Sequence, residues 1–335
     1  MCDESTIAPQ VQQRIIRYTL GIGLSVFFAG LLDWALAFIA PVFTAKFLID
    51  KPELHKETIY ELLLALIATM VLGLLLSGGI TSYPLPLLIF VGLMMLWGYF
   101  LFTDPKWNLF ATILLIAVLL LPFMAISNPG VSVYLAAGLS TSGVVAVAIY
   151  TLVHIYFPEP ASTFQGYAKP PMDRQQRWHA AFRAMLISYP VVCFFFWFQI
   201  SEALLTMIFI ALLSLMITAE KSVKISAFLI ISNGIGGLLA IASFSIISIV
   251  PELIFYALFI SLIGAVLGKK IYTKPEKAPI YATAFSTLLV LVGNTIMSSG
   301  DIDSNMVVRI FLLVLTGIYM ILASLFLETR SWKFL

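Results

Sequence analysis

The stretch LPLLIFVGLMMLWGYFLF, residues 85–102, carries no charged residue. It also lacks the alternation of apolar and polar residues that is typical of a strand in a membrane barrel. A transmembrane helix needs about 20 mostly apolar residues, and in lipid its backbone polar groups have to be satisfied within the segment. The stretch therefore predicts a membrane-spanning helix.

The composition of the whole chain agrees with this interpretation. Of its 335 residues, 61% are hydrophobic and 11% are charged, whereas soluble domains carry about 25% charged residues. A water-soluble fold could not bury so much apolar surface. The net charge of +2 gives no reason to expect a nucleic-acid partner, and we expect the lipid bilayer to surround most of the chain.

We predict an all-α polytopic membrane protein with twelve transmembrane helices. The second of them is the least certain, because no polar loop separates it from the first, and whether both cross fully is left open. The predicted segments are 18–33, 34–49, 58–79, 83–102, 107–126, 131–157, 178–199, 202–219, 222–248, 251–272, 277–297 and 304–327.

The basic residues predict how these helices are oriented. If the N-terminus is cytoplasmic, every Lys and Arg except Arg309 falls on the cytoplasmic side, which is 18 of the 19 in the chain (19 − 1). The loops predicted to face outward, near 80–83, 127–131, 199–202, 248–251 and 298–304, contain none. Cytoplasmic loops of membrane proteins carry an excess of Lys and Arg. We therefore expect both termini in the cytoplasm.

Two halves of six helices are indicated by recurring segments. A polar linker with four prolines, residues 158–177, separates a first membrane repeat, 1–157, from a second, 178–335. TDPK at 103–106 resembles TKPE at 273–276. Because each half has an even number of spans, the two repeats would be parallel, and transporters built from such repeats place substrate sites where the repeats meet and helices are short or broken.

Several residues are candidates for such a site. Pro122 and Gly293 occupy matching positions of the two halves and would break their helices, while Pro41 interrupts a short span. Asn294 follows Gly293, and Asn233 lies in SNGIGG at 232–237, which would interrupt the ninth span. We take Asn294 and Asn233 as candidate substrate-binding residues, although prolines and glycines are also common in ordinary membrane helices.

Three charged residues at the predicted outer face each have two interpretations. Arg309 either reaches the outer surface and pairs with a nearby aspartate, or faces a water-filled cavity and binds an anionic substrate through its planar guanidinium. Asp33 and Glu202 precede the second and eighth spans. They either favour a helix start or act as proton-coupling carboxylates.

Enzymatic chemistry is not indicated. His55, His154 and His179 show no metal-ligand spacing, and GAVLGKK at 264–270 lacks the length and the final Ser or Thr of a phosphate-binding loop. No nucleophile–base pair is visible. We expect no cofactor, no metal and no enzyme activity.

The opening RIIRYTLGIGLSVFFAGLLDWALAFIAPVFTAKFL (14–48) and the Arg that begins the last predicted helix resemble the fusaric acid resistance and aromatic acid exporter superfamily (FUSC-like). The length and the two fused units are most similar to its small bacterial branch, catalogued as domain of unknown function 2955. The resemblance implies a transporter of the bacterial inner membrane that exports aromatic carboxylic acids or toxic amphiphiles. It also implies a periplasmic membrane-fusion adaptor as a partner, and a homo-oligomer is left open. The alternatives are a passive anion channel and a non-transporting membrane subunit of an efflux assembly.

Overall fold

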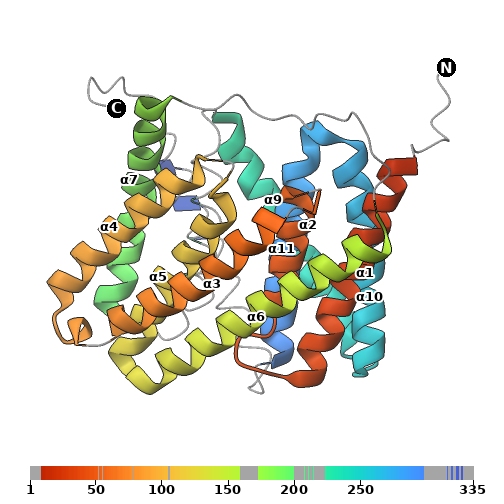
Figure 1. Cartoon of the computed structure of the whole chain (residues 1–335), viewed down its shortest axis with the longest axis horizontal. Helices are drawn as coiled ribbons and strands as arrows, with labels where there is room; N and C mark the ends of the chain where they lie inside the picture. Colours follow the sequence, from red (N-terminus) through yellow and green to blue (C-terminus); the bar gives the residue numbers. More distant parts are fainter. Residues whose placement is uncertain are drawn as a thin grey trace. The chain divides into compact units, whose positions relative to one another are not determined.

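A computed structural model shows a chain built from helices (Figure 1). It describes residues 9–158 except 52, 55, 78 and 105, then 173–199, 207, 210, 214 and 223–297, and finally 315, 318, 319, 322, 323 and 326. Within these residues every regular element is a helix, which confirms the all-α class.

The helices follow the predicted spans closely. Seven segments in the described part of the chain are long and apolar enough to cross a membrane, so the protein is a multi-pass membrane protein. They are α1 (Pro9–Leu32), α4 (Pro84–Phe102), α5 (Asn108–Ser127), α6 (Pro129–Tyr156), α7 (Arg174–Phe198), α10 (Leu253–Thr273) and Pro275–Ile296, which joins η2 (Pro275–Lys277) to α11 (Ala278–Met297). The remaining elements are α2 (Ile39–Asp50), α3 (Lys56–Ser77), η1 (Ile80–Ser82) and α9 (Val223–Ile247).

Helix α2 departs most from its prediction. It begins five residues later than expected (39 − 34) and has only 12 residues, about 18 Å of helix. The hydrocarbon core of a bilayer is about 30 Å thick, so α2 cannot cross it. All of its residues except Lys46, Ile49 and Asp50 are buried, which means that neighbouring helices surround it.

The described elements form two compact units, and each contains segments from both halves of the sequence. The first unit comprises residues 1–59, 141–168 and 231–299, and the second comprises residues 60–140, 169–230 and 300–335. In the first unit α1 packs along α10 and against α2, and α11 packs against both α10 and α2. In the second unit α4 packs against α5 and α7.

Small residues allow α1 and α10 to approach closely in the first unit. Gly23 faces Ser261, and Gly30 faces Leu253. The Tyr18 ring lies over Gly268, where a Cβ would come within 2.8 Å of the ring. Close approach through small residues is the usual way in which helices associate in lipid, where the hydrophobic effect does not drive helix association.

The second unit is arranged around α5, whose residues 109–123 are all buried. Gly92 on α4 receives the Tyr189 ring from α7, and the Tyr189 hydroxyl donates to the Leu88 carbonyl at 2.9 Å. Deeper in the unit the Tyr99 hydroxyl lies 2.7 Å from Ser188 Oγ and donates to Ser214 Oγ at 2.7 Å. All three of these side chains are fully buried, and hydroxyl groups buried in a membrane helix bundle need such partners.

The helix bounds of the two halves recur at nearly constant spacing. Adding 169 to the first residue of α4 gives 253, where α10 begins, and adding 169 to that of α5 gives 277, one residue before α11 begins (84 + 169; 108 + 169). Adding 166 to the last residue of α1 gives 198, where α7 ends (32 + 166). Asp33 and Gln199, the residues that follow α1 and α7, both have a positive φ, of 41° and 50°. Asp33 and Gln199 thus occupy equivalent positions relative to the ends of α1 and α7.

Candidate functional site

The turn that leads into α2 is buried and conformationally unusual. Leu36 has φ 61°, a left-handed conformation that costs a side-chain-bearing residue about 1–2 kcal/mol. Ser142 stabilises this turn, because its hydroxyl donates to the Leu36 carbonyl at 3.0 Å and accepts from Trp34 Nε1 at 2.8 Å. Ser142 lies in the middle of α6 (129–156). The turn is therefore held beside the centre of a spanning helix.

The other end of α2 is held by two tyrosines. Tyr272 on α10 donates its hydroxyl to the Leu48 carbonyl at 3.2 Å. Tyr150 on α6 points its hydroxyl at the carbonyls of Lys51 and Glu53, at 3.0 and 2.9 Å. These bonds satisfy carbonyls at and beyond the helix C-terminus, which have no partner within the helix. Helix α2 is thus a short buried helix that is fixed at both ends.

The predicted helix breakers do not break their helices. α5 continues through Pro122, α11 through Gly293, and α9 through residues 232–237. Proline is tolerated in membrane helices, and Pro122 is buried within α5. Gly293 instead serves close packing, since a Cβ there would lie 2.5 Å from Phe38 Cβ.

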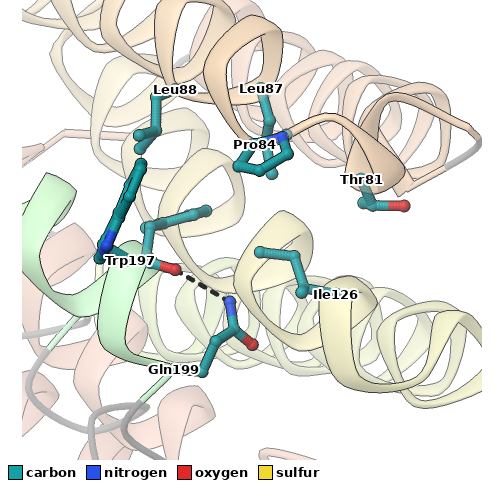
Figure 2. Close-up of a pocket in the computed structure, with 8 residues that line it drawn as sticks. Thr81, Pro84, Leu87, Leu88, Ile126, Trp197 and Gln199 are labelled. Carbon is teal, nitrogen blue, oxygen red and sulfur yellow. Dashed lines mark hydrogen bonds between the residues drawn. The ribbon is translucent and has the colours of Figure 1, made fainter.

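A cavity of about 290 Å³ lies in the second unit, where α4 begins and α5 and α7 end (Figure 2). Figure 2 shows the Trp197 ring on one side of the opening and Pro84 and Leu87 on another, with Gln199 and Ile126 below. Hydrocarbon side chains form most of the lining, and the described residues that line the cavity include no charged one. The lining residues are Thr81, Pro84, Leu87, Leu88, Ile126, Phe196, Trp197 and Gln199.

Gln199 is the principal polar group of this cavity. It closes α7 in a left-handed conformation, with its backbone N–H donating to the Phe195 carbonyl at 3.0 Å. Its side-chain Nε2 donates to the Phe196 carbonyl at 2.9 Å, which fixes the amide plane. An amide has two N–H donors and one carbonyl acceptor. One donor is used by Phe196, so the other donor and Oε1 remain to meet a ligand.

Two arginines are integrated into the helix packing at the ends predicted to be cytoplasmic. Arg17 on α1 is 2% exposed and is the only buried Lys or Arg among the residues whose burial is described. Arg177 on α7 caps the end of α4: Nε donates to Thr103 Oγ1 at 2.8 Å and Nη2 to the Phe100 carbonyl at 3.2 Å. The guanidinium of Arg177 also lies 4.4 Å from the centre of the Phe100 ring. A cation is favourable at the negative end of a helix dipole.

The residues predicted from the sequence to form a site are not among those that line this cavity, and two of them lie outside the described residues. Asp33 is exposed and follows the end of α1, so it does not cap the start of α2. Pro41 is buried in the first turn of α2, Asn294 is half-buried on α11, and Asn233 lies on α9. Arg309 and Glu202 lie outside the described residues.

Sequence reasoning missed the residues that line the cavity. Trp197 and Gln199 stand at the end of a predicted span, where aromatic and polar residues are normally interfacial. Only the packing of three helix ends brings these two residues next to the lining residues of α4 and α5. The hydrogen bonds from Ser142 to the turn before α2 were not predicted either, because they join residues more than one hundred positions apart.

Among the described residues, seven helices long and apolar enough to cross a membrane and a short buried helix define a polytopic α-helical membrane protein. The family model described as "Protein of unknown function (DUF2955)" matches residues 14–153, which extend from α1 through most of α6. This match, over less than half of the chain, supports the part of the sequence resemblance that names domain of unknown function 2955. Neither the curated proteins nor the solved structures contain a match.

Proposed function

We propose that the protein is a secondary transporter of the bacterial inner membrane that exports organic acids or toxic amphiphilic compounds. The observation that carries the proposal is α2. A buried helix of 12 residues, entered through a strained turn beside the middle of α6, is a discontinuous membrane element. Irregular backbone at membrane depth is tolerated only inside protein or beside a cavity, and discontinuous helices form the substrate sites of many transporters.

The proposed architecture consists of twelve spans in two parallel six-helix repeats, with both termini cytoplasmic. The recurring helix bounds and the paired left-handed residues Asp33 and Gln199 support the repeat. So do the helix pairs: α1 packs along α10 in the first unit, and α7 packs along α4 in the second. By the spacing of 166 and 169 residues, α7 is the counterpart of α1 and α4 is the counterpart of α10. The same helix pairing thus occurs once in each unit.

The substrate class of the proposal comes from the sequence resemblance, which implies aromatic or other carboxylic acids and a periplasmic adaptor as a partner. Arg309 is proposed to attract the anion, because a guanidinium binds carboxylates through two parallel hydrogen bonds. Asp33 and Glu202 are proposed as proton-coupling carboxylates. The exposure of Asp33 makes it accessible to solvent protons. The proposal makes the chain a carrier without enzyme activity.

Flux into sealed vesicles tests this proposal. The purified protein is reconstituted into liposomes, a pH gradient is imposed, and uptake of radiolabelled benzoate is compared with that of protein-free liposomes. Benzoate crosses lipid in its neutral form, so the decisive result is accumulation above the level that the pH gradient alone produces. A secondary transporter gives that excess, and a protonophore abolishes it. Gradient dissipation with measurable conductance would indicate a channel, and flux equal to that of protein-free liposomes would indicate a non-transporting subunit.

A further inference from the structure

We infer that the cavity between the ends of α4, α5 and α7 is a binding site that selects the uncharged form of a small ring-sized molecule, and that Gln199 determines this specificity. The inference rests on the proposed function only in taking the ligand to be a transported compound. The site itself is defined by the lining of the cavity, its volume and the fixed geometry of Gln199.

The described part of the lining carries no charge and opens to the surface at Trp197 and Gln199, which are both exposed. Six of the eight lining residues contribute hydrocarbon or indole surface, and Thr81 and Gln199 contribute neutral polar groups. An ionised carboxylate that enters such surroundings loses part of its hydration and finds no cation among the described lining residues to replace it. An amide or a protonated acid loses much less hydration free energy, because one hydrogen-bond donor and one acceptor of the protein can satisfy it. The cavity therefore discriminates by charge before it discriminates by shape.

The volume limits the occupant to a compact group. An apolar cavity of about 150 Å³ is sufficient to hold benzene, and this cavity measures about 290 Å³. One ring with a polar substituent fits such a space, whereas a whole phospholipid does not. The planar Trp197 side chain on one wall offers a flat surface for a ring (Figure 2), and aromatic rings pack in offset or edge-to-face arrangements worth about 0.5–1.5 kcal/mol.

Gln199 is prepared for a ligand before the ligand arrives. Its backbone is fixed in the left-handed conformation that ends α7, and its amide is held by the Phe196 carbonyl. The free N–H and Oε1 form a donor–acceptor pair that matches the carbonyl and N–H of an amide, or the carbonyl and O–H of a protonated acid. A group that does not have to be ordered on binding contributes more to affinity.

The position in the first unit that corresponds by helix spacing is occupied by a side chain. At the spacing given above, Phe196 and Pro84 correspond to Gly30 and Leu253. Leu253 packs directly onto Gly30, which leaves no space for a ligand between those two residues. Asp33, the residue that corresponds to Gln199, is an acid, and both residues are exposed. The sequence at the end of α7 thus replaces an acid by a neutral amide at the place where the cavity is open.

Equilibrium dialysis of the purified protein in lipid nanodiscs tests the inference with three radiolabelled probes of similar size. Benzamide is neutral, benzoate is an anion at pH 7, and benzyltrimethylammonium is a cation. We expect benzamide to bind saturably and both ions to bind at least about tenfold more weakly. Benzoate binding should rise as the pH falls towards the ordinary carboxyl pKa of about 4, because the neutral form then appears, while benzamide binding stays constant.

Two variants locate the site. Gln199→Glu should weaken benzamide binding about three- to tenfold at pH 7, because the free amide N–H is lost and a charge is added. Leu88→Trp should abolish binding by filling the cavity. Trp97→Phe is the matched control: Trp97 lies on α4 and is 43% exposed, but does not line the cavity, so binding should be unchanged. Gel filtration shows whether each variant is folded.

Three results would overturn the inference: benzoate binding as tightly as benzamide at pH 7, benzamide binding that survives both variants, or copurified lipid that occupies the cavity and is not displaced by benzamide. Failure of the transport proposal looks different. Vesicle flux that persists in folded Leu88→Trp would leave transport intact and refute the site, whereas charge-selective binding without any flux would leave the site intact and refute transport.

Discussion

Replacing Gly293 by alanine should destabilise the protein, although the same change usually stabilises a helix. Alanine is favoured over glycine inside a helix by about 0.8–1 kcal/mol. At Gly293, however, the new Cβ would lie 2.5 Å from Phe38 Cβ and 3.5 Å from Phe38 Cα. The first distance is more than 1 Å shorter than an ordinary carbon–carbon contact of about 3.5–4.0 Å. Because Phe38 is 5% exposed and immediately precedes α2, it has no free space into which to move.

The expected net effect is the difference between these two terms. Overpacking a well-packed core costs about 1–3 kcal/mol, so after the gain in helix propensity the loss should be up to about 2 kcal/mol. Gly237→Ala on α9 is the matched control, since nothing lies within 4 Å of its added Cβ, and that change should be neutral or stabilising. Phe38→Gly removes the Cβ that the new methyl group of Gly293→Ala would overlap. Gly293→Ala should therefore cost less stability in a Phe38→Gly background than in the wild-type protein.

The assay is thermal unfolding in detergent, followed by the fraction of protein that remains monodisperse after heating. The reasoning predicts that Gly293→Ala lowers the midpoint while Gly237→Ala does not. If Gly293→Ala had an unchanged midpoint but lost vesicle flux, Gly293 would be a flexible point needed for transport and not a packing position. If both glycine variants were equally stable, the close approach of α11 to Phe38 would itself be refuted.

Further expectations concern single side chains. Arg177→Ala should lower stability by about 1–3 kcal/mol in the same heating assay, because the hydrogen bonds to Thr103 and to the Phe100 carbonyl are lost; Arg177→Lys should recover little, since lysine lacks the planar fork. Tyr99→Phe should cost only about 1 kcal/mol, because Ser188 also donates to a backbone carbonyl on its own helix; a loss above about 3 kcal/mol would contradict this. Arg309→Ala should lower benzoate flux at equal abundance in the membrane, and Arg309→Lys should retain more of it. Normal flux in Arg309→Ala would leave Arg309 as a surface anchor.

Hydropathy was sufficient to predict most helices within a few residues, because a spanning helix has to be long and apolar. It placed the start of α2 too early for a physical reason. Residues 35–38, Ala-Leu-Ala-Phe, are as apolar as the helix that follows, so composition cannot distinguish a buried turn from a helix. The left-handed Leu36 is stabilised by Ser142, more than one hundred residues away. No local pattern contains that interaction.

Glycine and proline misled the prediction for a related reason. Their intrinsic tendency to break a helix applies to an isolated segment, whereas inside a bundle the neighbouring helix decides. Gly293 is where Phe38 approaches α11, and Gly92 is where the Tyr189 ring lies against α4. The cavity was beyond sequence reasoning altogether, because its walls come from three helix ends that are separated in sequence and meet only when the second unit is packed.

The two units show how corresponding helix pairs can diverge. In the first unit Gly23 faces Ser261, a small residue against a small one, and the matching pair in the second unit is Tyr189 against Gly92, a large residue against none. Further along the same helices Leu253 covers Gly30, while Phe196 and Pro84 stand at the edge of a cavity. In the first unit small residues therefore allow α1 and α10 to approach closely. In the second unit the Tyr189 ring fills the space beside Gly92, and the cavity lies further along the same two helices, beside Phe196 and Pro84. If the halves are repeats, as we propose, the change from Gly23 to Tyr189 and from Gly30 to Phe196 accompanies the change from a closed helix contact to one that borders a cavity.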